Sequence, residues 1–135
     1  YYLRAQTYFF LVRIWGDVPI LLDPVLSDKI ELKPRSPKEE VMKQILSDIE
    51  QSLSLFPEEG FVNKNYSSKP AAYALKADAL LWKAKVLSGG DSDLNEAVNA
   101  INEVEKSGVE LLPEYASVFN NANKRNAEII FSLYF

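Results

Sequence analysis

Residues 70–108 read PAAYALKADALLWKAKVLSGGDSDLNEAVNAINEVEKSG and predict two helices joined by a short turn. The first part places six alanines among Leu, Trp and Val, and small residues let neighbouring helices approach closely. Gly89 and Gly90 predict the end of this helix, and Asp93, three residues before Glu96, predicts an acidic cap for the next one. We expect one buried stripe on the second helix, formed by Leu94, Ala97, Val98, Ile101 and Val104.

This predicted pair is close in length to a tetratricopeptide hairpin, which uses ~34 residues. Its small-residue first helix and the Asn-Glu-Ala start of its second helix resemble that repeat, although the Trp, Gly and Pro pattern is not matched position by position. The pattern therefore favours tetratricopeptide-like hairpins, and an unspecific four-helix bundle is the alternative.

Two further helices are predicted upstream. Residues 1–15 space apolar side chains at helical separations before Gly16, and we expect Trp15, like Trp82 in the later helix, to lie in the core. The run Ser36-Pro37-Lys38-Glu39 predicts the next start, with a hydroxyl cap, proline at the first helical position and a glutamate that bonds back. That helix should end before Pro57. Long connections are expected up to about residue 35 and over 58–69.

The predicted fold class is therefore mainly all-α, with tetratricopeptide-like helical hairpins, long loops and a short C-terminal strand. Residues 1–56 would form the first helix pair, 70–108 the second, and 109–135 a loop followed by a strand at Glu128–Phe135, where strand-forming residues gather. The sequence opens without Met and stops within an apolar run, so we expect a single helical segment of a longer protein.

The composition excludes several kinds of chemistry. The 135 residues include no Cys and no His, which removes thiolate nucleophiles, thiolate metal sites and His-dependent triads. Fifteen Lys and Arg stand against 19 Asp and Glu, and this formal charge of −4 argues against a nucleic-acid partner. No apolar run approaches the ~20 residues that a membrane-spanning helix needs.

We predict no catalytic residues, no metal site and no cofactor. Asp91, Asp93 and Asn95 match the first three ligand positions of a calcium-binding EF-hand loop. The match then fails, because Glu96 and Asn102 replace the required Gly and Glu, so an acidic helix cap is the favoured interpretation. Nothing singles out a pair of glycosidase carboxylates among the loop acids Asp17, Asp23 and Asp28.

One loop offers the residue types that bind sugars. Aromatic rings stack on the apolar faces of sugar rings while amides bond to hydroxyl groups, and the loop after residue 57 carries both kinds of side chain. The weak candidates for ligand binding are Phe61, Asn63, Asn65 and Tyr66. The alternative is that the loop aromatics pack back onto the helices.

Arg4–Ile20 reads RAQTYFFLVRIWGDVPI and resembles the signature helix and GDVP turn of the SusD/RagB family, the surface glycan-binding lipoproteins of Gram-negative outer membranes. Further matches follow in the family's order over essentially the whole chain. They are Ser36-Pro37 with the helix that follows, Leu55-Phe56-Pro57, Lys69–Lys85 and Glu128–Ser132. Phe56 departs from the family, which usually has Leu before the proline.

This resemblance implies a non-catalytic protein on the surface of the outer membrane that binds oligosaccharides or other nutrients. It further implies delivery to a SusC-like TonB-dependent transporter, and a lipid anchor outside this segment as the only membrane association. The family's ligand-contacting residues are drawn largely from stretches outside this segment and vary between members, so none is carried over. Two alternatives remain: a generic peptide-binding tetratricopeptide-like interaction domain, and a fragment of a glycoside hydrolase.

Overall fold

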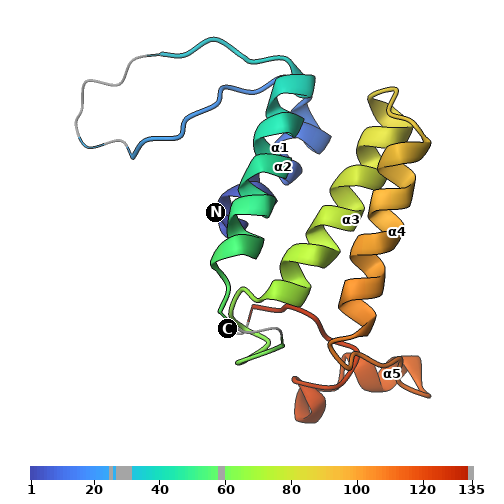
Figure 1. Cartoon of the computed structure of the whole chain (residues 1–135). Coiled ribbons are helices and arrows are strands. Elements are labelled where there is room, and N and C mark those ends of the chain that lie inside the picture. Colours follow the sequence, from blue (N-terminus) through green and yellow to red (C-terminus); the bar gives the residue numbers. More distant parts are fainter. Residues whose placement is uncertain (25, 27–31, 58–59, 134–135) are drawn as a thin grey trace.

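Four long helices make up most of the structure. The computed structural model describes residues 1–24, 26, 32–57 and 60–133. The long helices are α1 (Tyr2–Trp15), α2 (Lys38–Leu55), α3 (Lys69–Val86) and α4 (Asp91–Glu105). A short helix α5 (Tyr115–Val118) and a 3-10 turn at Asn121–Asn123 follow. α1 lies behind α2, and α3 and α4 run side by side (Figure 1). The prediction of a mainly helical chain is confirmed.

The main core lies between α1, α2 and α3. Each of these helices contributes apolar side chains to it, and the rings of Phe9 and Trp82 meet edge to face at 6.2 Å. The prediction that Trp82 packs in the core is thus confirmed. The buried members of the cluster are Ala5, Tyr8, Phe9, Val12, Val18, Val41, Met42, Ile45, Ile49 and Ala79.

The alanine-rich α3 is the central helix and contacts both α2 and α4. Ala79 faces the main core, whereas Ala77 packs with Ala97 and Ala100 of α4, so small side chains occur at both helix contacts. Lys76 links the same three helices by placing its ammonium group 2.7 Å from Glu50 of α2 and 2.7 Å from Glu96 of α4. Burial alone would lower the pKa of Lys76, but its hydrogen bonds to the two glutamates outweigh burial and raise it.

The start of α2 differs from the predicted capping box. Ser36 makes no side-chain cap, and its backbone N–H instead donates to the carbonyl of Val18 at 3.0 Å. The carboxylate of Asp17 accepts the backbone N–H of Lys38 at 2.9 Å, so the first turn of α2 is capped from a turn 21 residues earlier. The local capping prediction was therefore wrong, because a tertiary contact supplies the acceptor.

The start of α4 also differs. The helix begins at Asp91, with Gly90 as its N-cap and without a side-chain cap. Asp93 lies inside the first turn, where its carboxylate binds the ammonium group of Lys83 at 2.6 Å. The predicted cap at Asp93 was wrong, because this carboxylate pairs with α3 rather than with the backbone of its own helix.

Three residues that we expected to be buried are exposed. Val98 and Ile101 of α4 are 58% and 44% exposed, since α3 is the main neighbour of α4 among the described residues and covers only the face of Ala97, Ala100 and Val104. Trp15 is 57% exposed, because it ends α1 on the side away from the helix core. These predictions assumed that every apolar stripe has a partner within the chain.

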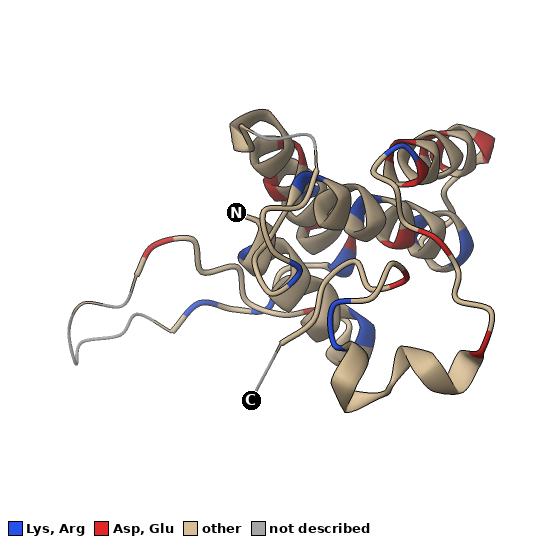
Figure 2. Cartoon of the chain, turned by 90° about the horizontal axis from the view of Figure 1, so that it is seen from below, with Lys and Arg blue, Asp and Glu red and all other residues tan. Residues whose placement is uncertain are grey.

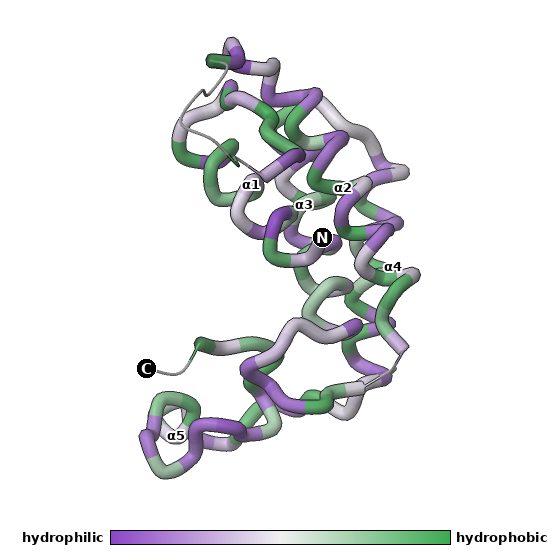
Figure 3. The backbone as a smooth tube through the Cα atoms, turned by 90° about the vertical axis from the view of Figure 1, so that its left-hand side faces the viewer, coloured by the Kyte–Doolittle hydropathy of each residue, from purple (hydrophilic) through white to green (hydrophobic). Residues whose placement is uncertain are grey.

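The predicted C-terminal strand is not formed in its described part, residues 128–133. The N–H of Ser132 donates a backbone hydrogen bond to the carbonyl of Lys64, on the loop at 60–68, at 2.9 Å. Among the described residues this part has no neighbouring strand with which to pair. Side chains hold the region instead: Glu128 accepts the N–H of Leu112, and the buried Asn126 amide donates to the carbonyl of Val118. Figure 3 shows this C-terminal region beyond one end of the helices.

Candidate functional site

The loop at 60–68 and the segment at 126–132 form one surface. The ammonium group of Lys64 donates to the carbonyl oxygens of Asn126 at 2.7 Å and Ala127 at 3.4 Å. The backbone carbonyl of Lys64 in turn accepts the N–H of Ser132 at 2.9 Å. These contacts join segments more than 60 residues apart in the sequence, so the four candidate sugar-binding residues lie on an anchored loop.

Phe61 presents only part of its ring to solvent. The Lys64 ammonium group lies 4.9 Å from the centre of the Phe61 ring, which places a cation against one ring face. The Phe61 side chain is also half-buried. A sugar ring could stack only on what remains uncovered.

Asn63, Asn65 and Tyr66 share a tight turn. The carbonyl of Asn63 accepts the N–H of Tyr66 at 3.1 Å, and the Asn63 side-chain oxygen accepts the N–H of Asn65 at 3.4 Å. The Tyr66 ring is 62% exposed and is open to stacking. The structure therefore brings the four predicted residues together, with Tyr66 as the exposed aromatic side chain.

The same surface contains two acceptor atoms without a hydrogen bond among the described residues. Both the Asn65 side-chain oxygen and the Ser132 hydroxyl oxygen are buried and unpaired. Buried polar atoms normally find a partner, so these two are exceptions among the described residues. Sequence reasoning did not single out Lys64 or Ser132, because only the folded chain brings 60–68 against 126–132.

A second candidate surface surrounds Trp15. An open cavity of about 380 Å³ lies beside it and is lined also by Asp17, Pro19 and Arg35. An exposed indole next to a guanidinium and a carboxylate combines an apolar ring face with groups that bond to hydroxyls. Sequence reasoning missed this site, although the position of Trp15 directly before the helix-ending Gly16 was a signal that its side chain leaves the helix bundle.

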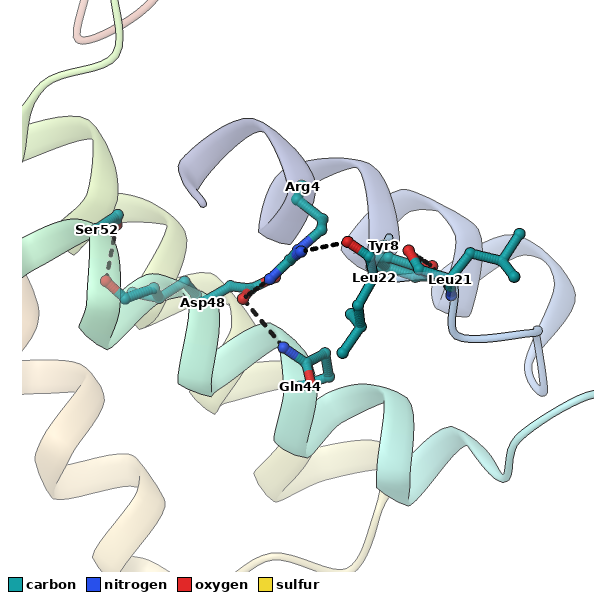
Figure 4. A network of polar contacts seen from close by, with 8 residues as sticks. Arg4, Tyr8, Leu21, Leu22, Gln44, Asp48 and Ser52 are labelled. Carbon is teal, nitrogen blue, oxygen red and sulfur yellow. Dashed lines mark hydrogen bonds and ion pairs between the residues drawn. The ribbon is translucent and has the colours of Figure 1, made fainter. Parts of the chain in front are cut away.

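A buried ion pair holds α1 and α2 together near this surface. The Arg4 guanidinium donates two hydrogen bonds of 2.7 Å to the carboxylate of Asp48, which also accepts one from the Gln44 amide at 3.0 Å (Figure 4). The Asp48 side chain is 2% exposed and that of Arg4 31%. The hydrogen bond to Asp48 raises the pKa of Arg4, which favours the charged guanidinium.

Side chains of α1 also anchor the connection between α1 and α2. Arg4 donates a third hydrogen bond to the carbonyl of Leu22 at 3.2 Å. The Tyr8 hydroxyl accepts the N–H of Leu21 at 2.7 Å and donates to the carbonyl of Leu21 at 3.1 Å (Figure 4). The backbone pairing of Val18 with Ser36 holds the two ends of this connection side by side, and both ends leave the helices together (Figure 1).

The described residues show no arrangement suited to hold a metal: no group of three or more potential ligands gathers among them. Figure 2 marks the charged positions along the ribbon: the charged residues of α4 are all acidic, whereas those of α3 are lysines with the one exception of Asp78. Within the part of the chain that the structure describes, no helix is long and apolar enough to cross a membrane.

Comparisons with known proteins point to one family. The profile of a SusD-like family, described as "Starch-binding associating with outer membrane", matches residues 1–81. SusD-like protein P25 of Formosa agariphila is 30% identical to this chain over an alignment 138 residues long. The alignment covers 99% of the chain and 24% of that protein.

Solved structures give the same result. A SusD superfamily protein from Bacteroides vulgatus superposes with a TM-score of 0.88 at 37% identity, covering 98% of this chain and 27% of that one. A crystal structure with xylogluco-oligosaccharide superposes with a TM-score of 0.88 at 26% identity, over 98% and 27% of the two chains. The chain thus spans about a quarter of the length of these relatives.

Proposed function

Because the chain belongs to the SusD-like family of starch-binding proteins that associate with the outer membrane, we propose that it forms the helical scaffold of a surface protein that captures oligosaccharides. The protein binds its ligand without cleaving it and passes it to a TonB-dependent transporter of the SusC type. It works at the exposed face of the outer membrane, where polymers too large for simple pores must first be held.

The observation that carries this proposal is the family match over residues 1–81, together with the superposition on a structure that contains xylogluco-oligosaccharide. Small residues and ion pairs pack the four long helices against one another, and this packing suits a rigid support. A rigid support lowers the entropy cost of binding, because the ligand-contacting side chains are already ordered.

Two aromatic side chains are proposed to contact sugar rings. Tyr66 is exposed on the anchored turn, and Trp15 lines the same open cavity as Arg35. Phe61 and Asn63 belong to the same turn as Tyr66 and serve mainly to shape it, since the Phe61 ring is partly covered and the Asn63 oxygen is used within the turn.

Affinity measurements on the longer polypeptide that carries this chain test these contacts. With xylogluco-oligosaccharide and malto-oligosaccharides as ligands, Tyr66→Ala or Trp15→Ala should weaken binding about fivefold to tenfold, because a lost ring contact costs about 1–1.4 kcal/mol. Tyr115→Ala is the matched control, since Tyr115 is 77% exposed on α5 and lies on neither candidate surface. If both site variants bind like the control, these two residues do not contact the ligand.

Hand-over to a transporter needs a separate experiment. The longer polypeptide, expressed in its own host with an affinity tag, should co-purify with a TonB-dependent outer-membrane protein whose gene neighbours its own. Recovery of the tagged protein alone, under conditions that preserve outer-membrane complexes, would contradict the delivery step and leave glycan capture standing.

A further inference from the structure

The open cavity beside Trp15 combines an apolar wall with one basic group. Its volume of about 380 Å³ lies within the range of ~300–1,000 Å³ that small-molecule sites occupy. Val18, Pro19 and Leu21, from the connection after α1, supply much of the apolar wall. Arg35 is the only cation among the described lining residues. A sugar in this cavity would therefore meet a guanidinium beside a largely hydrocarbon surface.

The Arg35 guanidinium is exposed and has no partner in the described part of the chain. None of the described carboxylates lies within ion-pair distance of it. The described stretch 32–38 contains two further basic residues, Lys33 and Lys38, and no acidic one. Because no described group neutralises this charge, it is open to an anion from outside the chain.

The one acid on the cavity wall already has a role in the fold. The Asp17 carboxylate accepts the backbone N–H of Lys38 at 2.9 Å, in the first turn of α2. A carboxylate at this position is partly offset by the positive end of the helix dipole. Asp17 therefore repels an incoming anion less than a free carboxylate would.

Hydrogen bonds hold the backbone around the cavity in place. The N–H of Ser36, the residue after Arg35, donates to the carbonyl of Val18 at 3.0 Å. The hydroxyl of Tyr8, another lining residue, bonds to both backbone groups of Leu21 (Figure 4). Walls that are ordered in advance lower the entropy cost of binding a ligand.

We propose that this cavity binds an acidic sugar, a hexuronate residue of an oligosaccharide, with the sugar ring on the Trp15 indole and the sugar carboxylate on Arg35. The N–H donors of arginine form a fork that matches both oxygens of a carboxylate, and such charge-assisted bonds are roughly twice as strong as bonds between neutral groups. The Trp15 side chain is 57% exposed and offers an apolar face to the ring. A neutral sugar would make the same ring contact but only the weaker bonds to its hydroxyls.

This inference rests on the proposed function and adds the class of sugar that one part of the surface prefers. Matched ligands test it on the longer polypeptide that carries this chain. Oligosaccharides of starch and of xyloglucan are each compared with the same sugar after its free C6 hydroxymethyl groups have been oxidised to carboxylates. The oxidised form should bind about three to five times more tightly, which is the gain expected of an exposed ion pair.

Two variants of equal charge show whether Arg35 is responsible. Arg35→Gln should bind the neutral and oxidised forms equally. Lys85→Gln, which removes a positive charge from an exposed position in the last turn of α3, should keep the preference for the oxidised form. In the parent protein the preference should shrink in about 0.5 M NaCl, because salt screens exposed charges.

Three results would overturn the inference. Equal affinity of the parent protein for the neutral and oxidised forms would remove the preference for acidic sugars and leave oligosaccharide capture standing. A preference that survives Arg35→Gln would mean that the carboxylate binds elsewhere. Absence of binding to all of these ligands would contradict the proposed function and this inference together.

Discussion

At the scale of single residues, the pair of Arg4 and Asp48 is the strongest polar contact between α1 and α2. The carboxylate is fully enclosed and takes three hydrogen bonds, so its charge is stable in the core only while Arg4 is present. Breaking a buried pair by removing one partner costs far more than breaking an exposed pair, because the remaining charge loses both its partner and its solvent. The connection after α1 depends on the same guanidinium through the carbonyl of Leu22.

We therefore expect Arg4→Met, which leaves the buried Asp48 carboxylate without its partner, to lower the free energy of unfolding by about 3 kcal/mol, near the lower end for a buried pair. Asp78→Asn is the control: its partner Arg13 lies 3.4 Å away at an exposed site, and the loss should stay below about 0.5 kcal/mol. Urea denaturation measures both. Equal losses for the two variants would show that the pair of Arg4 and Asp48 stabilises the fold no more than an exposed ion pair does.

Tyr2 predicts a change in stability at alkaline pH. Burial raises the pKa of the Tyr2 hydroxyl from 10.0 to about 12, so the folded chain holds this proton where the unfolded chain releases it. The contribution of Tyr2 is therefore fully present below pH 10 and is lost as pH rises from 10 to 12. Tyr2→Phe should lose less stability than the parent over that interval, as measured by thermal melts. Parallel pH curves for both proteins would rule this out.

The candidate sugar-binding residues show how far a sequence can locate a site. Residue type and loop position were enough to bring Phe61, Asn63, Asn65 and Tyr66 together, because they are neighbours in the chain. The partners that order the loop, Lys64 with the backbone of Asn126 and Ser132 with Lys64, follow only from tertiary packing. Trp15 was misjudged for a similar reason: an apolar helix position does not reveal whether anything covers it.

At the scale of helices, periodicity and proline or glycine signals located all four long helices, because these signals act within a few residues. The capping groups at the helix starts were harder to predict. Ser68 caps α3 through a local hydrogen bond to Ala71 at 3.3 Å, whereas α2 takes its cap from Asp17 and α4 uses no side chain. The described part of the predicted strand, residues 128–133, forms no strand because strand formation needs a partner, and strand-forming composition cannot supply one.

The turn between α3 and α4 predicts a sharp difference between two neighbouring glycines. A Cβ atom on Gly89 would lie 2.8 Å from the Cα of Ala84 and would displace the carboxylate of Asp93, which binds Lys83. A Cβ on Gly90 would meet nothing within 4 Å. We expect Gly89→Ala to destabilise the chain by about 2–3 kcal/mol, as overpacking does, and Gly90→Ala to cost at most about 1 kcal/mol, because alanine is a poorer N-cap than glycine. Similar midpoints for the two variants in urea would contradict this account of the turn.

At the scale of the whole molecule, the chain is a stack of two helix pairs with a C-terminal region folded beneath it (Figures 1 and 3). Its polar groups are used to order loops and to join helices, as in the Arg4–Asp48 pair and the Lys76 bridge. Exposed apolar side chains occur on α3 and α4, on several loops, and on the outer side of α1, where Leu3, Phe10 and Ile14 are more than half exposed. We propose that such a molecule supports a binding surface.

The most direct test of this view is a binding measurement that also follows the fate of the ligand. The longer polypeptide should be titrated by calorimetry with oligosaccharides of starch and of xyloglucan, and the recovered sugars should be sized by mass spectrometry. The account predicts saturable binding to at least one oligosaccharide and recovery of that sugar at its original length. Absence of binding to both classes, or shortened products that one Asp or Glu substitution abolishes, would contradict it.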